Sequence, residues 1–124
     1  KTEIKKPAIK PEKSKPAVPE YTVVRVDLLS DAFEQGKVFI TVNQSAGTES
    51  LRLLCEKITK QYTEFSNIVI CLYTNNDTGR EMANGNAPNV SKEEQITAWL
   101  AMYTYNPVEG AYFDDNPGGY LGAY

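Results

Sequence analysis

Residues 49–74, ESLRLLCEKITKQYTEFSNIVICLYT, contain the two elements that decide the fold. In the first half, apolar side chains recur three or four positions apart, which places them on one face of a helix. These side chains belong to Leu51, Leu54, Cys55, Ile58 and Tyr62. In the second half, NIVICLYT is apolar at nearly every position, as is typical of a strand covered on both faces. The sequence therefore predicts a helix over residues 49–64, with Thr48 as its N-cap, and a central strand over residues 67–74.

Two runs before the helix alternate between apolar and polar residues, with the period of a half-buried strand. In residues 21–29, YTVVRVDLL, the predicted inward side chains are Val24, Val26 and Leu28. In residues 38–42 they are Val38, Ile40 and Val42. Because the turn between the runs contains Gly36, an antiparallel hairpin is the simplest connection. A strand, a helix and another strand in this order favour a right-handed crossover, which makes the two strands parallel.

The chain after the central strand gives weaker signals. Residues 75–90, NNDTGREMANGNAPNV, predict a long polar loop. Ser91 and Glu94 then form a capping-box pattern that should start a helical turn at Lys92. Residues 96–105 fit either a helix or a strand. The turn sequence NPVEG that follows favours a short helical turn, then a strand over residues 98–105 and a second short strand over residues 111–113.

Together these elements predict an α+β domain with a ββαββ-like order, in which a single amphipathic helix packs on one face of a mixed sheet of four or five strands. One helix covers only one face, so the C-terminal third or a partner chain should cover the other. Residues 21–124 are expected to form this single domain. Cys55 and Cys71 are expected to be two buried thiols, with a disulfide between helix and sheet as the alternative.

The first 20 residues, KTEIKKPAIKPEKSKPAVPE, differ in character from the rest. Four prolines and few apolar residues predict a disordered or polyproline-like tether. This segment has a net charge of +3 and the remainder of the chain has a net charge of −6. So acidic a domain argues against non-specific nucleic-acid binding. The sequence contains no apolar run long enough for a transmembrane helix.

The composition excludes several classes of chemistry. The chain has no histidine, which removes imidazole-dependent triads and histidine-ligated metals. Two cysteines cannot form an all-thiolate zinc site, and the glycine-rich motifs that bind phosphate groups are missing. The sequence therefore favours a non-enzymatic function and calls for no cofactor. A hydrolase that depends on carboxylates or a bound cation is the enzymatic alternative.

Oxygen-rich loops supply the candidate metal ligands. Asp77 follows the central strand, near Glu81, and Asp114 and Asp115 lie beside a Pro-Gly turn. Carboxylate oxygens are the ligands that Ca²⁺ prefers, but the spacing matches no complete calcium loop. Turn formation explains the same residues without a metal.

Aromatic side chains crowd into the last 26 residues. The candidate ligand-binding residues are Trp99, Tyr105, Tyr112 and Tyr120. Tyrosine and tryptophan combine apolar area with a polar group, so they are frequent in surfaces that contact proteins or carbohydrates. The alternative is that these rings cover the second face of the sheet.

A Lys/Pro-rich tether, the NIVICLYTN strand after one amphipathic helix and the AWLAMYTYNPVEG segment resemble, in layout, small uncharacterised exported or lipid-anchored bacterial domains. The resemblance implies a periplasmic or outer-surface location, with a signal and perhaps a lipidated cysteine upstream of Lys1. The expected function is a binding or interaction module of the cell envelope, presented on a flexible spacer. A structural domain that packs on a neighbouring chain is a further alternative.

Overall fold

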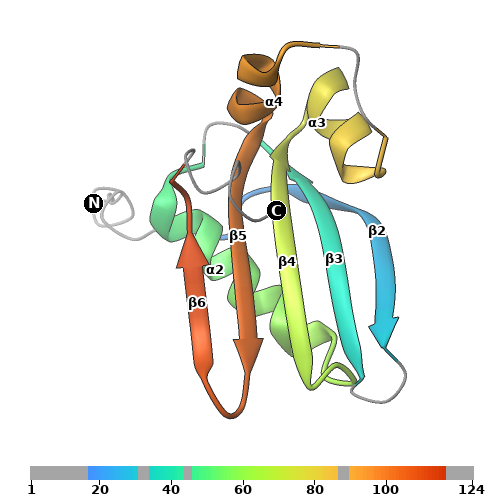
Figure 1. Ribbon diagram of the computed structural model, residues 1–124. Helices are drawn as coiled ribbons and strands as arrows, with labels where there is room; N and C mark the ends of the chain where they lie inside the picture. The colour runs from blue at the N-terminus through green and yellow to red at the C-terminus, as the bar shows by residue number, and fades with distance from the viewer. Residues whose placement is uncertain (1–16, 31–33, 44–45, 87–89, 117–124) are drawn as a thin grey trace, which may run out of the picture.

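The computed structural model describes residues 17–30, 34–43, 46–86 and 90–116. Most of the predicted tether, residues 1–16, lies outside the described residues. The fold is α+β, and the described strands form one five-stranded sheet whose spatial order follows the sequence (Figure 1). The strands are β2 (Tyr21–Ser30), β3 (Gln35–Val42), β4 (Asn67–Thr74), β5 (Trp99–Asn106) and β6 (Gly110–Asp114).

The sheet is mixed. β3 and β4 are parallel, and all other neighbouring strands are antiparallel. The helix α2 (Thr48–Gln61) connects the two parallel strands. These findings confirm the predicted hairpin, the parallel crossover and the interior position of β4.

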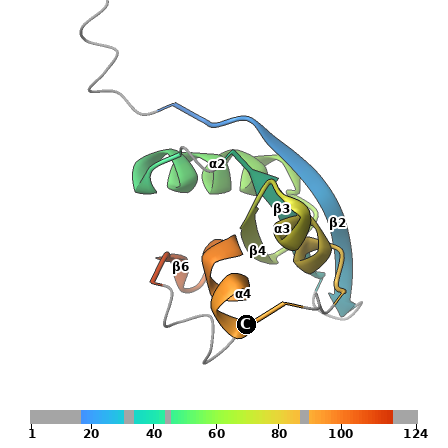
Figure 2. The ribbon, with the colours of Figure 1, turned by 90° about the horizontal axis from the view of Figure 1, so that it is seen from above.

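The first face of the sheet packs against α2, the one helix on that side among the described residues (Figure 2). The predicted stripe is confirmed, because Leu51, Leu54, Cys55 and Ile58 are all buried. They contact buried side chains of β3, β4 and β5 in one apolar cluster, in which Val38, Ile40 and Val42 are fully buried, as predicted.

The start of α2 differs from the prediction. Gly47 occupies the N-cap position and gives no side-chain hydrogen bond. The expectation that Thr48 caps the helix is therefore wrong. Thr48 lies one residue inside the helix, and its hydroxyl donates to Asp115 Oδ2 at 2.7 Å. This bond ties the start of α2 to the segment that follows β6.

The second face carries two short helices, so the expectation of a single helix on one face is wrong. They are α3 (Asp77–Ala83) and α4 (Lys92–Ala98), which lie together over the upper part of that face (Figures 1 and 2). Phe39, Cys71, Tyr73, Met82 and Trp99 belong to the second apolar cluster that these helices cover. The described part of the chain therefore contains three helices around the sheet.

The helix α3 falls within residues predicted as a loop. Asn76 caps it, with its side-chain oxygen accepting a hydrogen bond from Gly79 N at 2.8 Å. Gly79 is required by a close approach, because an added Cβ would lie 1.9 Å from the backbone oxygen of Thr74. Met82 and Ala83 are buried against the sheet. Packing, rather than helix propensity, therefore stabilises this turn-rich segment.

The interpretation of residues 92–106 is confirmed. Ser91 and Glu94 form a reciprocal capping box at the start of α4. The helix ends at Ala98, and β5 begins at Trp99. A helical turn followed by a strand thus resolves the ambiguity between helix and strand.

The edge strand β2 departs from simple alternation. Its register with β3 shifts between Val23 and Arg25, and again between Leu28 and Ser30. The prediction that Val24, Val26 and Leu28 share the inner face is therefore wrong. Val24 packs against the second cluster, whereas Val26 and Leu28 are 40% and 59% exposed.

Arg25 fastens β2 to α3. Its Nε donates to the carbonyl oxygen of Ala83 at 3.3 Å, and its guanidinium lies 4.0 Å from the centre of the Phe39 ring. A third contact joins Arg25 Nη1 to Asp27 Oδ2 at 3.0 Å. The outermost strand is thereby joined to the end of α3 as well as to β3.

Cys55 and Cys71 are free thiols and both are buried, which confirms the favoured prediction. Cys55 belongs to the first cluster and Cys71 to the second, on opposite sides of the sheet. Burial is the main cause that raises the pKa of both thiols above its usual range. Among the described helices, none is long and apolar enough to cross a membrane.

Candidate binding groove beside helix α2

The diagonal course of α2 leaves one corner of the first face uncovered (Figure 1). A helix of 14 residues is about 21 Å long, whereas the eight residues of β5 extend about 27 Å. The uncovered corner contains an open groove of about 570 Å³. It is lined by Glu56, Thr59, Lys60, Thr63, Phe65, Ser66, Tyr103, Tyr105 and Pro107.

Two tyrosines of β5 contribute to the groove from the sheet. Tyr103 is only 4% exposed, and its side chain is hydrogen-bonded to that of Thr59. The Thr59 hydroxyl also donates a hydrogen bond to the carbonyl oxygen of Cys55 at 2.8 Å. Burial raises the pKa of Tyr103, so this phenol stays neutral. Tyr105 lies two residues further along the same face and is 37% exposed.

Phe65 contributes a second aromatic surface. Its ring is stacked on Tyr62, with ring centres 5.9 Å apart and an angle of 4° between the planes. Gly36 makes room for this ring, since an added Cβ there would lie 2.2 Å from a carbon of Phe65. The glycine predicted as part of a turn is thus the second residue of β3, and it allows Phe65 to lie against the strand.

The rim of the groove is formed by the hairpin between β5 and β6. Asn106 Oδ1 accepts hydrogen bonds from the backbone N–H groups of Val108 and Glu109, at 3.0 and 2.7 Å. Gly110 has a φ of 83°, a conformation that glycine adopts without strain. This turn holds Pro107 in the wall and presents Val108 at 91% exposure. An apolar side chain so exposed, beside an aromatic groove, is typical of a contact surface.

The structure separates the predicted aromatic residues. Tyr105 lies in the groove. Tyr112 is 57% exposed but pairs with Thr104, so it lies on the opposite face of the sheet from Tyr105. Trp99 is 3% exposed in the second cluster, and Tyr120 lies outside the described residues. The described aromatic candidates therefore do not form a common surface.

Each candidate metal ligand has its own partner. Asp77 contacts Arg80 at 2.7 Å, and Asp114 Oδ1 accepts a hydrogen bond from Asn116 N at 2.9 Å. Asp115 binds the Thr48 hydroxyl. Within the described ranges, no three carboxylates or thiols gather as a metal site would require. Each of these three carboxylates therefore has a separate partner among the described residues.

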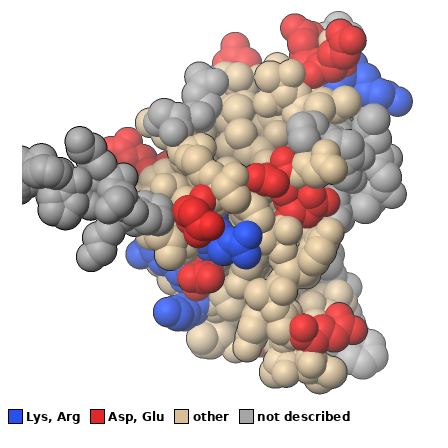
Figure 3. Space-filling model, turned by 90° about the vertical axis from the view of Figure 1, so that its left-hand side faces the viewer, with Lys and Arg blue, Asp and Glu red and all other residues tan. Residues whose placement is uncertain are grey.

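The described residues on the face at the β6 edge form no large patch of one charge (Figure 3). On the side of the molecule at the β6 edge, acidic and basic side chains are scattered among neutral ones (Figure 3). Glu56 and Lys60 lie one helical turn apart on the α2 side of the groove. The groove thus combines an aromatic interior with one charge of each sign.

Several groove residues were missed in the sequence. Thr59, Phe65 and Pro107 come from three separate segments that only the fold brings together. One usable signal was the apolar Val108 within the turn sequence NPVEG, because an apolar residue at a hairpin tip has no core to enter.

Comparisons with protein-family models, curated proteins and solved structures found no match. The function must therefore be inferred from the geometry of the chain itself.

Proposed function

We propose that this protein is a non-enzymatic interaction module of the cell envelope that binds an extended segment of a partner protein in the groove beside α2. The observation that carries the proposal is the joining of the groove to an exposed apolar hairpin tip, through Tyr105, Pro107 and Val108. Such a surface suits an aromatic or aliphatic anchor side chain from a partner.

The shape of the groove favours a chain segment over a small molecule. The groove is open along one side, whereas sites for small ligands enclose most of the ligand surface. The hydroxyl group of Thr63 can hydrogen-bond to the backbone of a bound segment. Glu56 and Lys60 can select the polar residues that flank the anchor.

A screen of random peptides against the immobilised domain tests this function. Peptides that share an aromatic or aliphatic anchor should bind the wild-type protein. Tyr105→Ser should weaken them about tenfold or more, as expected for the loss of an aromatic hot spot. Tyr112→Ser is the matched control, because it removes an exposed tyrosine from the other face and should leave binding unchanged.

Two results would contradict the proposal. One is a screen that enriches no peptide, and the other is enriched peptides that bind Tyr105→Ser and wild type equally. Binding of glycans that depends on Tyr105 would instead favour a carbohydrate partner. Thermal melting of both variants would separate a loss of binding from a loss of folding.

The envelope location and the spacer role of residues 1–20 are parts of this proposal that rest on sequence layout alone. The alternative of a structural domain on a neighbouring chain predicts self-association, which sedimentation of the purified protein would detect. The hydrolase alternative predicts turnover that depends on Asp77, Glu81, Asp114 or Asp115.

A further inference from the structure

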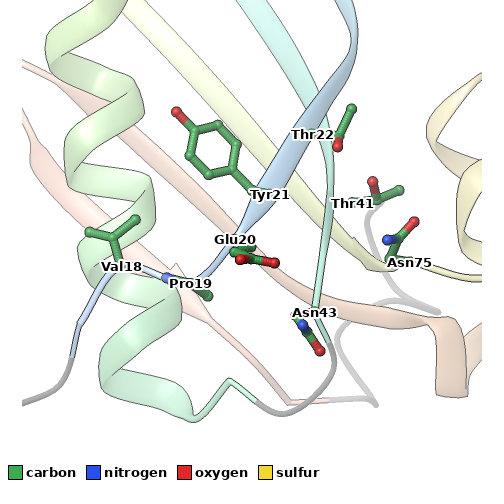
Figure 4. A pocket seen from close by; sticks show the side chains of 8 residues that line it. All are labelled: Val18, Pro19, Glu20, Tyr21, Thr22, Thr41, Asn43 and Asn75. Atoms are coloured by element: carbon green, nitrogen blue, oxygen red, sulfur yellow. The ribbon is translucent and has the colours of Figure 1, made fainter.

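The chain ahead of β2 approaches the sheet from the side of α2. Residues 17–20 run along the outer side of α2, and their course extends toward the part of the molecule where β6 lies (Figure 2). Figure 4 shows Val18 and Pro19 over this helix, and Val18 is 41% exposed. The described chain therefore begins on the surface of α2, the helix that forms one wall of the groove.

The residues before Ala17 are numerous enough to return to the groove. Three prolines in residues 1–16 predict a polyproline II conformation, which extends about 3.1 Å per residue. Helix α2 is about 21 Å long, so about eight residues of this conformation would pass its whole length. With residues 9–16 alongside α2, residues 1–8 can lie in the groove.

The loops at the open end of the groove are acidic. Beyond the pair of opposite charges on α2, Glu34 precedes β3, Glu64 lies between α2 and β4, and Glu109 lies in the hairpin between β5 and β6. All three are exposed, and the described residues of these loops include no lysine or arginine. Ser66 N donates to the carbonyl oxygen of Glu34 at 3.0 Å, which holds two of the loops together. This end of the groove therefore favours a basic segment.

The aromatic rings of the groove are spaced across three neighbouring strands. Gly36, Ile68 and Tyr105 pair in one row across β3, β4 and β5. The ring of Phe65 lies against Gly36, so Phe65 and Tyr105 flank Ile68 on strands about 10 Å apart. Pro107 continues this surface. Grooves lined by aromatic side chains are the usual binding sites for proline-rich segments in the polyproline II conformation.

Residues 1–16 have the composition that such a surface requires. They contain six lysines and two glutamates, a net charge of +4. Polyproline II has three residues per turn, so Ile4 and Pro7 would face the same side. Lys5 and Lys6 would then point to the other sides of the segment, where carboxylates of the loops can attract them.

We infer that residues 4–7, IKKP, occupy the groove of their own chain until a partner segment displaces them. Ile4 and Pro7 contact Phe65 and Tyr105, and the two lysines face the acidic loops. The inference rests on the function proposed for the groove, and it adds a regulation of that site. A tethered segment has an effective concentration on the order of 1 mM, so an intrinsic dissociation constant of about 0.1 mM would keep about 90% of the grooves occupied. The apparent affinity for a partner would then be about tenfold lower.

Nuclear magnetic resonance of the ¹⁵N-labelled full chain tests this contact. Ile4→Ser/Pro7→Ser removes both apolar contacts, and Ile9→Ser/Pro11→Ser is the matched control, because it removes the same residue types outside residues 4–7. The backbone amide signals of Phe65 and Tyr105 should shift in the first variant and not in the control. High salt should move the wild-type signals toward those of the first variant, since it screens the attraction between the lysines and the loops.

Peptides from the screen of the wild-type protein give a second measurement. They should bind Ile4→Ser/Pro7→Ser about tenfold more tightly than wild type, and they should bind the control as they bind wild type. The inference is overturned if Ile4→Ser/Pro7→Ser changes neither the two amide signals nor the peptide affinity, or if the control changes them equally. It is also overturned if the difference between wild type and variant grows with protein concentration, which would assign the contact to a second copy.

The same measurements separate this inference from the function proposed for the groove. Peptides that bind wild type and Ile4→Ser/Pro7→Ser equally, without a shift at Phe65 or Tyr105, would leave the function standing and refute the own-chain contact. Shifts at both residues in a protein that enriches no peptide would support the own-chain contact and refute the binding of a partner segment.

Discussion

Replacing Gly79 with alanine should destabilise the protein, although alanine is the better helix former. The added Cβ would lie 1.9 Å from the backbone oxygen of Thr74 and 2.8 Å from its hydroxyl. Real Cβ atoms essentially never approach another atom within 3.0 Å, so α3 would have to move away from the end of β4 by more than 1 Å. The contacts of Met82 and Ala83 with the second face would loosen with it.

The expected magnitude follows from three contributions. Overpacking at a backbone contact costs about 1–3 kcal/mol. Disturbing the hydrogen bond from Gly79 N to Asn76 costs about 1 kcal/mol. The higher helix propensity of alanine returns about 1 kcal/mol. The free energy of unfolding should therefore fall by about 2 kcal/mol.

Urea unfolding followed by Trp99 fluorescence measures this change, because Trp99 is buried in the cluster that α3 covers. Gly47→Ala is the matched control. It changes a glycine that caps α2 in open space, and it should cost no more than about 0.5 kcal/mol. If Gly79→Ala unfolds at the same urea concentration as wild type, the close approach of α3 to β4 is refuted.

Three other changes test other parts of the fold. Leu54→Ala removes a fully buried side chain of α2 and should lower the free energy of unfolding by about 2–5 kcal/mol in urea, whereas a smaller loss would mean that α2 packs loosely. Above about pH 9 the thiols of Cys55 and Cys71 ionise in the unfolded chain but not in the folded one. The free energy of unfolding, measured as a function of pH, should therefore decrease as the pH rises, by up to about 1.4 kcal/mol per pH unit for each thiol. An alanine variant of both cysteines should have a shallower alkaline slope, and an unchanged slope would contradict the assignment. Arg25→Met should cost about 1–2 kcal/mol by thermal or urea unfolding, since it removes the hydrogen bond to α3, and a stability equal to wild type would show that α3 needs no link to β2.

The sequence was sufficient to predict the elements in which burial requires apolar side chains at regular positions. The stripe of α2 and the apolar run of β4 each face a core that admits few other residue types, so both were predicted to within a few residues. The parallel pairing of β3 and β4 followed from chain order and the handedness of crossovers. The capping box of α4 could be predicted because Ser91 and Glu94 are close in sequence and hydrogen-bond to each other.

The sequence was insufficient where a distant contact decides the local structure. Segment 77–83 contains Gly79, which lowers helix propensity, and the reason for that glycine is the backbone of Thr74 on another element. In β2, an extra residue between Val23 and Arg25 moves the side chains after it to the opposite face of the sheet from the one that simple alternation predicts. Neither feature leaves a periodic trace in the local sequence.

The candidate sites were only partly predictable for the same reason. Tyr105 was identified because exposed tyrosine is common in contact surfaces, but its neighbours Thr59 and Phe65 belong to segments that the fold alone brings near. Trp99 has the same chemical appeal in the sequence, yet it is buried because β5 begins at that residue and points it into the second cluster. Residue type alone could not separate the two cases.

The two register shifts of β2 affect how copies of the chain meet. A flat outer strand offers a regular row of amide and carbonyl groups along which a second molecule can align and begin a fibril. Each shift breaks that row, so a foreign strand that fits one part of β2 is out of step with the next. At the other margin β6 has only five residues, too few for long pairing. The register shifts of β2 therefore disfavour edge-to-edge association of molecules at high protein concentration.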